Sequence, residues 1–259
     1  MARVHLHRRR FLTLSAAGAG SILLGGCDRL SSAPDFLEFL SSAEGLTYRA
    51  QRLLGGSHAF AREFSPADIS PVFKVNGTTT PDSEEYAAFR ENNFADWRLR
   101  VDGLVANPLE LSLTELQALP QRTQITRHDC VEGWSAIGKW QGVPLAFVLT
   151  KAGLLPAARF VVFHCADALE QTLDGTGQYY ESIDLIDAFH PQTILAHSLN
   201  DAPLSVGHGA PLRLRVERQL GYKQAKYIMG IEVTDRLDEF GRGKGGFWED
   251  RGYEWYAGI

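Results

Sequence analysis

Hydrophobic and polar positions alternate in the middle of the chain, and this alternation predicts strands. Trp97, Leu99 and Val101 are separated by arginines, which is the two-residue period of a half-buried strand. The stretch RTQITRHDC alternates in the same way and predicts a strand that ends at Cys130. RFVVFHCAD is a short and nearly continuous apolar run, typical of a buried strand. Further strands are expected on both sides of the Leu-Asn-Asp turn in QTILAHSLNDAPLSV, and within APLRLRVER and AKYIMGIEVTDR.

Helix signals lie between these strands. Ser112 and Glu115 have the spacing of a capping box, and Pro120 follows as a stop. In VPLAFVLTKAGL, Pro144 stands near the expected helix start and Gly153 near its end. A short helix is expected in SIDLIDAFHP, and GLTYRAQRLLGG has apolar residues at helical spacing.

Strands and helices are mixed without a strict strand–helix–strand rhythm. The sequence therefore predicts an α+β fold with a mixed sheet rather than a doubly wound one. We expect one main domain at 71–240, a tether with helical turns at 27–70 before it, and a tail rich in glycine and aromatic residues at 241–259. Residues 71–95 are expected to be loop-like. No glycine-rich dinucleotide or phosphate-binding loop stands where a strand meets a helix.

The first 26 residues predict an export signal. Positive charges precede a short apolar run at 11–24, which is too short for a comfortable permanent membrane span. Arg8-Arg9 with the following residues resembles the twin-arginine motif. The run ends in LGGC, which resembles a lipoprotein cleavage box and implies acylation of Cys27, and Asp28 then implies the inner membrane. The expected location is periplasmic, tethered through Cys27; plain cleavage that leaves Cys27 free is the alternative.

Composition argues against one class of partner and bears on whether the cysteines are paired. The 259 residues are 44% hydrophobic, enough for a sizeable core. Without residues 1–26, 22 Lys and Arg remain against 31 Asp and Glu, a net charge of about −9 that argues against nucleic acid. Cys130 and Cys165 then accompany Cys27, and two cysteines in an exported protein can pair. Export of an already folded protein from the reducing cytoplasm argues against that pairing.

Cys130 stands among charged residues and beside a helix breaker, unlike a buried structural cysteine. It follows His128 and Asp129 and precedes Glu132 and Gly133. One alternative is a Cys/His nucleophile pair. Another is a zinc site, although the spacing matches no compact ligand pattern. The histidines considered are His128 and His208 for the first alternative, and His128, His164, His197 and His208 for the second.

Two segments together resemble the molybdopterin-binding domain of the sulfite oxidase superfamily. DCVEGWS is similar to the cysteine loop of its periplasmic methionine-sulfoxide reductase branch, and GHGAPLRLRV…GYKQAKYI is similar to the family's pterin-binding segment. The resemblance covers about residues 70–235. It implies a Mo-molybdopterin cofactor, in which a soft protein thiolate suits the metal.

The resemblance also implies roles for individual residues. Cys130 would be the metal ligand and the catalytic position. Arg213 and Lys226 would bind the phosphate end of the pterin, a task suited to a guanidinium and an ammonium. Further cofactor contacts are implied for Asn92, Asn93, Cys165, His208, Gln224 and Ala225. Cys165 replaces a threonine of that branch, so its contact is expected through the backbone.

Departures from the family pattern point to the substrate. Animal and plant sulfite oxidases follow the cysteine with an arginine-rich stretch, whereas Val131 and Glu132 follow Cys130 here. A neutral sulfoxide or N-oxide suits this loop better than a sulfite dianion. The chain ends about 25 residues after the pterin segment. We therefore expect a monomer without a haem or dimerisation domain, which exchanges electrons with a separate membrane cytochrome or quinol-linked subunit.

The expected function is oxygen-atom transfer by an exported molybdenum–molybdopterin oxidoreductase. Two other classes stay open at this point. One is a lipoprotein that binds cofactor or ligand without turnover. The other is a Cys- or zinc-dependent hydrolase, which would need no pterin.

Overall fold

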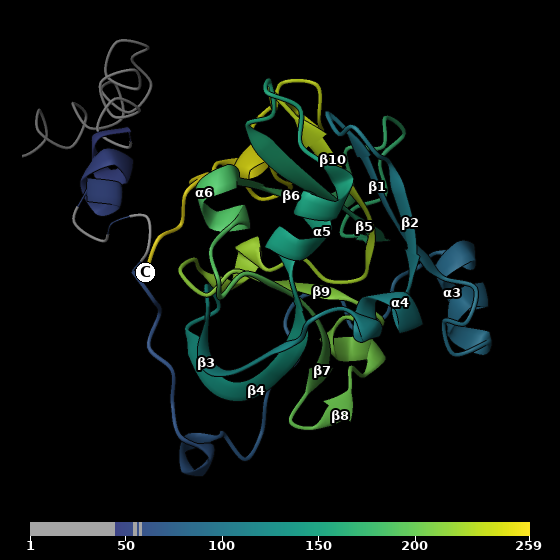
Figure 1. Ribbon diagram of the computed structural model, residues 1–259, viewed down its shortest axis with the longest axis vertical. Helices are drawn as coiled ribbons and strands as arrows, with labels where there is room; N and C mark the ends of the chain where they lie inside the picture. The colour runs from purple at the N-terminus through teal and green to yellow at the C-terminus, as the bar shows by residue number, and fades with distance from the viewer. Residues whose placement is uncertain (1–44, 54–55, 57–58) are drawn as a thin grey trace, which may run out of the picture. The chain divides into compact units, whose positions relative to one another are not determined.

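The computed structural model describes residues 45–53, 56 and 59–259 (Figure 1). The chain divides into two units between Leu54 and Gly55. In the first unit, residues 45–53 are helical, as their apolar spacing predicts. The expected signal peptide, the lipoprotein box and Cys27 lie outside the described residues. Within the described part of the chain, no helix combines the length and the apolar character needed to cross a bilayer.

One sheet of the second unit has five strands in the order β2-β1-β10-β5-β6. β1 pairs with β10 in parallel and every other pair in this sheet is antiparallel, so the sheet is mixed as expected. The first strand lies where the alternation predicts it, and the buried strand lies where the continuous apolar run predicts it. The strand bounds are β1 Arg98–Gly103, β2 Leu109–Ser112, β5 Phe160–Ala168, β6 Gln178–Asp184 and β10 Ile228–Thr234.

The other sheet is antiparallel, with the order β3-β4-β7-β8 and with β9 paired to β7. β3 ends at Cys130, as the sequence predicts. β4 was not expected from the pattern, because Gly138 and Gly142 interrupt it. Gly142 is required there, since a Cβ would lie 2.1 Å from the Leu195 carbonyl oxygen of β7. The bounds are β3 Arg122–Cys130, β4 Trp134–Pro144, β7 Ile194–Leu199, β8 Ala202–Pro203 and β9 Arg213–Arg215.

Short helices close the connections. The capping box of Ser112 and Glu115 is present at the start of α4, and Gly153 ends α5 with a positive φ of 70°. The expectation of a loop throughout 71–95 was wrong. α3 lies there, capped by Ser83, because Tyr86 on its inner face is buried against the domain. The helix bounds are α3 Glu84–Glu91, α4 Leu113–Ala118, α5 Leu145–Ala152 and α6 Leu185–Ala188. The 3-10 turns are η1 Pro66–Asp68, η2 Val206–His208, η3 Gly221–Lys223 and η4 Glu249–Arg251.

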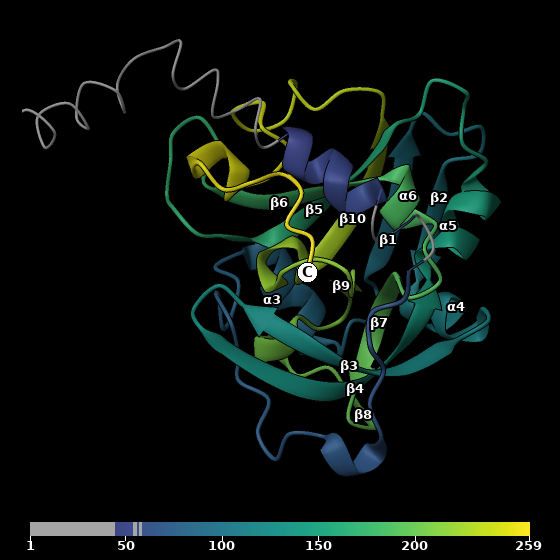
Figure 2. The same cartoon turned by 90° about the vertical axis from the view of Figure 1, so that its left-hand side faces the viewer.

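Two views show how the sheets are arranged. Figures 1 and 2 place β3 and β4 on one side of the second unit and β5, β6 and β10 on the other, with β9 between them. The turn η3, which follows β9, contacts both β3 and β6. Residues 213–226 therefore cross the space between the sheets, where side chains from both can meet them.

Segments before and after the main domain pack on this unit. Phe64 N donates to Ile125 O of β3 at 2.9 Å, and the Gln192 side chain holds both backbone groups of Ala61. After β10, the tail returns to β6, where Phe247 N donates to Tyr180 O at 3.0 Å. The tail thus lies beside β6, where Tyr180 pairs with His164 of β5.

Candidate functional site

A pocket opens where several polar segments meet. It encloses about 590 Å³, counting the space open to solvent. Its wall combines the cysteine loop, an upstream loop, the end of β5, the η3 turn and the tail. The lining residues are Asn76, Gly77, Thr78, Cys130, Val131, Glu132, Asp167, Leu169, Tyr179, Gly221, Tyr222, Gln224, Lys226 and Trp248.

Cys130 lies half-buried in this pocket as a free thiol. It is the last residue of β3, and the turn that follows contains Gly133 with φ of 82°. Burial raises the pKa of the Cys130 thiol, and the carboxylate of Glu132 raises it further. The thiol is thus protonated near neutral pH without a metal. A coordinated metal ion would remove that proton.

Arg213 lies behind the pocket with much of its hydrogen-bonding capacity unused. The residue is fully buried, and its Nη1 donates to the His208 carbonyl at 3.0 Å. Its Nε and Nη2 have no partner among the described residues. Unpaired buried guanidinium groups are costly, so this arrangement suits an anion that supplies the missing acceptors.

Lys226 lies close to Arg213. Gly209 separates their stems: a Cβ there would lie 3.0 Å from Lys226 Cβ and 3.2 Å from Arg213 Cβ. Burial and the Arg213 charge lower the pKa of Lys226 to about 7. Two cations held together in this way favour an anionic ligand between or beside them.

Carbonyl groups of an upstream loop hold the lysine in place. Lys226 Nζ donates to Asn76 O at 2.6 Å, to Thr78 O, and to Gly207 O at 3.0 Å. Tyr227 adds a bond from its hydroxyl to Thr78 O at 2.8 Å. The loop at 76–78 is therefore fixed against the segment that resembles the family's pterin-binding segment, and it lines the same pocket.

Asp167 was not among the expected site residues. It lines the pocket, it is 3% exposed, and its Oδ1 has no partner among the described residues. Burial raises its pKa to about 6. A buried acceptor of this kind fits the donor groups of a nitrogen-rich ring.

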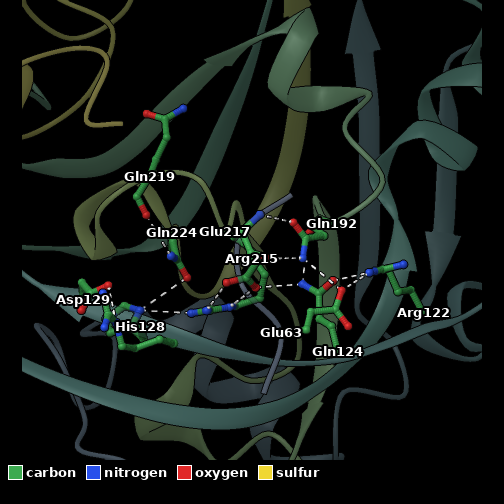
Figure 3. A network of polar contacts seen from close by, with 12 residues as sticks. Glu63, Arg122, Gln124, His128, Asp129, Gln192, Arg215, Glu217, Gln219 and Gln224 are labelled. Atoms are coloured by element: carbon green, nitrogen blue, oxygen red, sulfur yellow. Dashed lines mark hydrogen bonds and ion pairs between the residues drawn. The ribbon is translucent and has the colours of Figure 1, made fainter. Parts of the chain in front are cut away.

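A buried polar network connects Cys130's strand to β9 (Figure 3). Arg215 forms a two-bond ion pair with Glu217, with distances of 2.9 and 2.6 Å, and its Nη1 lies 3.0 Å from His128 Nδ1. Glu217 also accepts from Gln124 Nε2 at 2.8 Å. Gln124, His128 and Cys130 occupy alternate positions of β3, so their side chains share one face. The network fixes the face that presents Cys130.

The η3 turn packs closely on this face. A Cβ at Gly221 would lie 2.6 Å from both Cε1 and Nε2 of His128, so only glycine fits there. Burial lowers the pKa of His128 well below its usual value, and Arg215 and Arg213 lower it further. The ring is therefore neutral, which argues against His128 as a charged partner for a reactive thiolate.

Other expected contacts lie farther from the pocket wall. His208 uses both ring nitrogens, on Ser205 Oγ at 2.8 Å and on Phe73 O at 3.0 Å. The Ala225 carbonyl accepts from Leu214 N at 2.8 Å. Cys165 is a buried free thiol that packs in the main hydrophobic cluster. None of these three is among the lining residues, and their cofactor contacts remain predictions.

Asn92 and Asn93 do not line the pocket either. Both are exposed at the end of α3, where the Asn92 amide donates to Asp96 Oδ2 at 2.6 Å. The structure instead brings Asn76, Gly77 and Thr78 to the pocket. The sequence marked this stretch only as a loop; the signal available was an Asn-Gly pair inside a polar run.

A metal site built from several protein side chains has little support around Cys130. Among residues 45–53, 56 and 59–259, no group of three or more His, Cys, Asp or Glu side chains is arranged to hold a metal ion. His164 and His197 are engaged elsewhere, with Glu232 at 3.0 Å and Gln121 at 2.9 Å. The alternative of a zinc site therefore lacks its ligands in the described part.

Known proteins resemble this chain over most of the pocket-forming region. The profile of the family described as "Oxidoreductase molybdopterin binding domain" matches residues 86–240. A protein of Azospira oryzae, "Putative protein-methionine-sulfoxide reductase subunit YedZ1", is 38% identical over 259 residues, with 97% of this chain and 87% of the relative covered. The "Protein-methionine-sulfoxide reductase catalytic subunit MsrP" of Xanthomonas campestris pv. campestris is 34% identical over 167 residues, 62% of this chain and 52% of the relative.

A solved structure shows a weaker likeness. The sulfane dehydrogenase SoxCD of Paracoccus pantotrophus aligns with a TM-score of 0.48 and 23% identity, over 55% of this chain and 39% of that one. The classification rests on the family profile and on the Azospira oryzae relative. The chain belongs to the oxidoreductase molybdopterin-binding domain family, and it is a molybdopterin-dependent oxidoreductase with a mixed α+β fold.

Proposed function

We propose that this protein is an extracytoplasmic reductase that removes the oxygen atom from a neutral sulfoxide, with an N-oxide as the alternative substrate, at a molybdenum–molybdopterin centre. One observation carries the proposal. The free thiol of Cys130 lies in the same pocket as Lys226, behind which Arg213 leaves two buried N–H groups without acceptors. A thiolate ligand and an anion-binding end are the two features that this cofactor needs.

The residues present fit the cofactor. Cys130 would hold the metal, because a soft thiolate suits molybdenum. Arg213 would bind the phosphate, which would supply the acceptors that Arg213 lacks. Lys226, whose three N–H groups donate to backbone carbonyls, would contribute its charge, and the phosphate would offset the repulsion between the two cations. Asp167, Gln224 and the backbone groups of 76–78 would contact the pterin rings. When bound, the cofactor supplies the oxygen-atom exchange and the two-electron redox change.

The protein's own residues determine which substrate approaches. Glu132 lines the pocket beside Cys130, and its carboxylate disfavours a sulfite dianion by like-charge repulsion. Val131, Leu169 and Trp248 add apolar surface to the wall. A neutral sulfoxide with an apolar substituent therefore fits this pocket better than a small anion. Reduction consumes two electrons and two protons per sulfoxide and releases a thioether and water.

The electrons require a second protein or carrier. Two relatives carry names that call them a subunit of a protein-methionine-sulfoxide reductase. We therefore propose a separate redox partner at the membrane, together with export of this chain and its tethering through Cys27. The tether would keep the pocket near such a partner.

The test starts with the full-length protein produced in a host that makes molybdopterin. We expect about one molybdenum and one pterin per chain, and turnover of aryl and alkyl sulfoxides with a reduced one-electron dye as donor. Sulfite should be oxidised far more slowly. A folded protein that carries the cofactor but reduces no sulfoxide or N-oxide would favour the binding lipoprotein. Folded protein without molybdenum that hydrolyses esters or peptides would favour the Cys- or zinc-dependent hydrolase.

A further inference from the structure

The tail beyond residue 240 contributes to the pocket although the family profile ends there. Trp248 is among the lining residues, whereas the profile matches only 86–240. The indole is partly exposed, unlike its neighbours Phe247 and Glu249, which are buried. One side chain of the tail is thus presented to the pocket while those on either side anchor it.

Buried contacts fix the backbone on both sides of Trp248. Phe247 stacks on Tyr179, a second lining residue, with ring centroids 5.7 Å apart and planes inclined by 28°. Glu249 and Glu181 both pair with Lys223 Nζ, and all three side chains are essentially inaccessible to solvent. Because Lys223 belongs to η3, this ion triad locks the tail to the turn that supplies Tyr222 and Gln224 to the pocket.

Three aromatic rings pack against one another beside the pocket, and two of them line it. Tyr253 lies 5.2 Å from Trp248 and 5.2 Å from Tyr222, measured between ring centroids. Tyr222 and Trp248 line the pocket, whereas Tyr253, which is 41% exposed, is not among the lining residues and packs against both rings. We name Tyr222, Trp248 and Tyr253 the aromatic wall. The three rings come from two segments that the Lys223 triad joins.

We propose that Trp248 determines substrate specificity, by packing its indole against the apolar substituent on the sulfoxide sulfur. This inference rests on the proposed function and names the group that the pocket selects. Aromatic rings attract other rings and sulfur through geometry-dependent contacts that add to the effect of burial. Cys130 lines the same pocket, so a substituent placed against Trp248 would lie in the space that also contains the thiol.

The test compares two sulfoxides on the molybdenum-loaded protein. For wild type and each variant, kcat/KM is measured for methyl phenyl sulfoxide and for dimethyl sulfoxide with the same reduced dye, and their ratio is reported. The ratio does not depend on the fraction of folded or loaded enzyme, so a purely structural defect leaves it unchanged. We expect Trp248→Leu to lower the ratio about 3- to 10-fold, which corresponds to one lost aromatic contact.

Two further variants test whether the effect requires the loss of an aromatic ring at position 248. Trp248→Phe keeps a ring and should stay within about twofold of the wild-type ratio. Trp255→Phe is the matched control, because Trp255 lies in the same tail, donates to Ser182 Oγ at 2.8 Å, and does not line the pocket. Its ratio should equal that of the wild type.

A second readout does not depend on turnover. Methyl phenyl sulfone should change the tryptophan fluorescence of the loaded wild type and of Trp255→Phe in a saturable manner, and it should not do so in Trp248→Leu. Sulfoxide reduction with an unchanged ratio in Trp248→Leu, or an equal or absent fluorescence change in wild type and that variant, would overturn the inference alone. If the loaded wild type reduced neither sulfoxide, the proposed function would fail, and this inference with it.

Discussion

Arg215 Nη1 lies 3.0 Å from Nδ1 of His128, two residues before Cys130 on the same face of β3. A guanidinium only donates hydrogen bonds, so Nδ1 accepts, and the neutral ring carries its proton on Nε2. The contact joins the strand that ends at the thiol to β9, which carries Arg213. The two halves of the proposed site are thus linked by a buried bond.

Loss of this bond should loosen the site. His128→Ala leaves Arg215 Nη1 buried without its partner, and we expect the free energy of unfolding to fall by about 1–3 kcal/mol. Urea unfolding of the cofactor-free protein measures this, and molybdenum retention should fall in parallel. Thr123→Ala, on the exposed face of the same strand, is the control and should change neither. Equal stability of the two variants would contradict the role of the contact.

The two described cysteines should respond oppositely to replacement by alanine. Cys130 is half-buried in the pocket, so Cys130→Ala should abolish molybdenum binding and turnover while the free energy of unfolding changes by less than about 1 kcal/mol. Cys165 packs in the hydrophobic cluster, so Cys165→Ala should cost about 1 kcal/mol and retain the metal. Elemental analysis measures the molybdenum content of both variants, and urea unfolding measures their stability. Unchanged molybdenum content in Cys130→Ala would remove Cys130 from the metal site.

Arg213 should contribute to cofactor binding without stabilising the cofactor-free protein. Its guanidinium is buried with two N–H groups lacking partners, so Arg213→Met should leave the cofactor-free protein equally stable or up to about 2 kcal/mol more stable. The same change removes a donor for the phosphate and should lower pterin retention at least tenfold. Thermal unfolding of the cofactor-free form and pterin fluorescence of the loaded form measure the two effects. A cofactor-free Arg213→Met protein that is strongly destabilised would show that Arg213 supports the fold itself.

Lys226 should make the stability of the cofactor-free protein depend on pH. Its pKa is about 7 in the folded chain against 10.5 for an ordinary lysine, so the unfolded chain binds more protons between these values. The free energy of unfolding should therefore rise with pH across that window, and this contribution should be lost as the pH falls toward 7. The slope from this group is at most about 1.4 kcal/mol per pH unit.

The measurement is urea unfolding between pH 7 and pH 9. Lys226→Met should flatten the rise, because it removes the titrating group while other groups stay the same. The loaded protein should also show a smaller rise, since a bound phosphate favours the charged lysine in the folded state. A slope identical in wild type and Lys226→Met would show that other groups control this range.

The Lys223 triad should be a strong anchor for the tail. Lys223→Met would leave Glu181 and Glu249 buried together without their cation, and we expect a loss of about 3–5 kcal/mol of stability. Arg236→Met removes an exposed ion pair with Glu239 and should cost less than about 1 kcal/mol. Urea unfolding compares the two. A small effect of Lys223→Met would mean that the carboxylates are protonated and hold the tail without the lysine.

Patterns between neighbouring residues predict the local elements, and two short segments indicate the class of chemistry. Alternation of polar and apolar residues predicts that β3 ends at Cys130, and the capping box predicts the start of α4, because these signals depend on neighbours a few residues away. The cysteine loop and the segment that resembles the family's pterin-binding segment were enough to indicate the family. They did not reveal β4, whose Gly142 lies against the backbone of Leu195 in β7, more than fifty residues away.

Which residues share the pocket follows from the tertiary fold alone. Asn76 and Thr78, Asp167 and Trp248 come together because β9 and η3 cross between the two sheets and the tail folds back on β6. Asn92 and Asn93, equally polar in sequence, are left outside on α3. The proximity of these residues depends on strand order and on contacts between distant segments. No periodicity along a single stretch of chain encodes it.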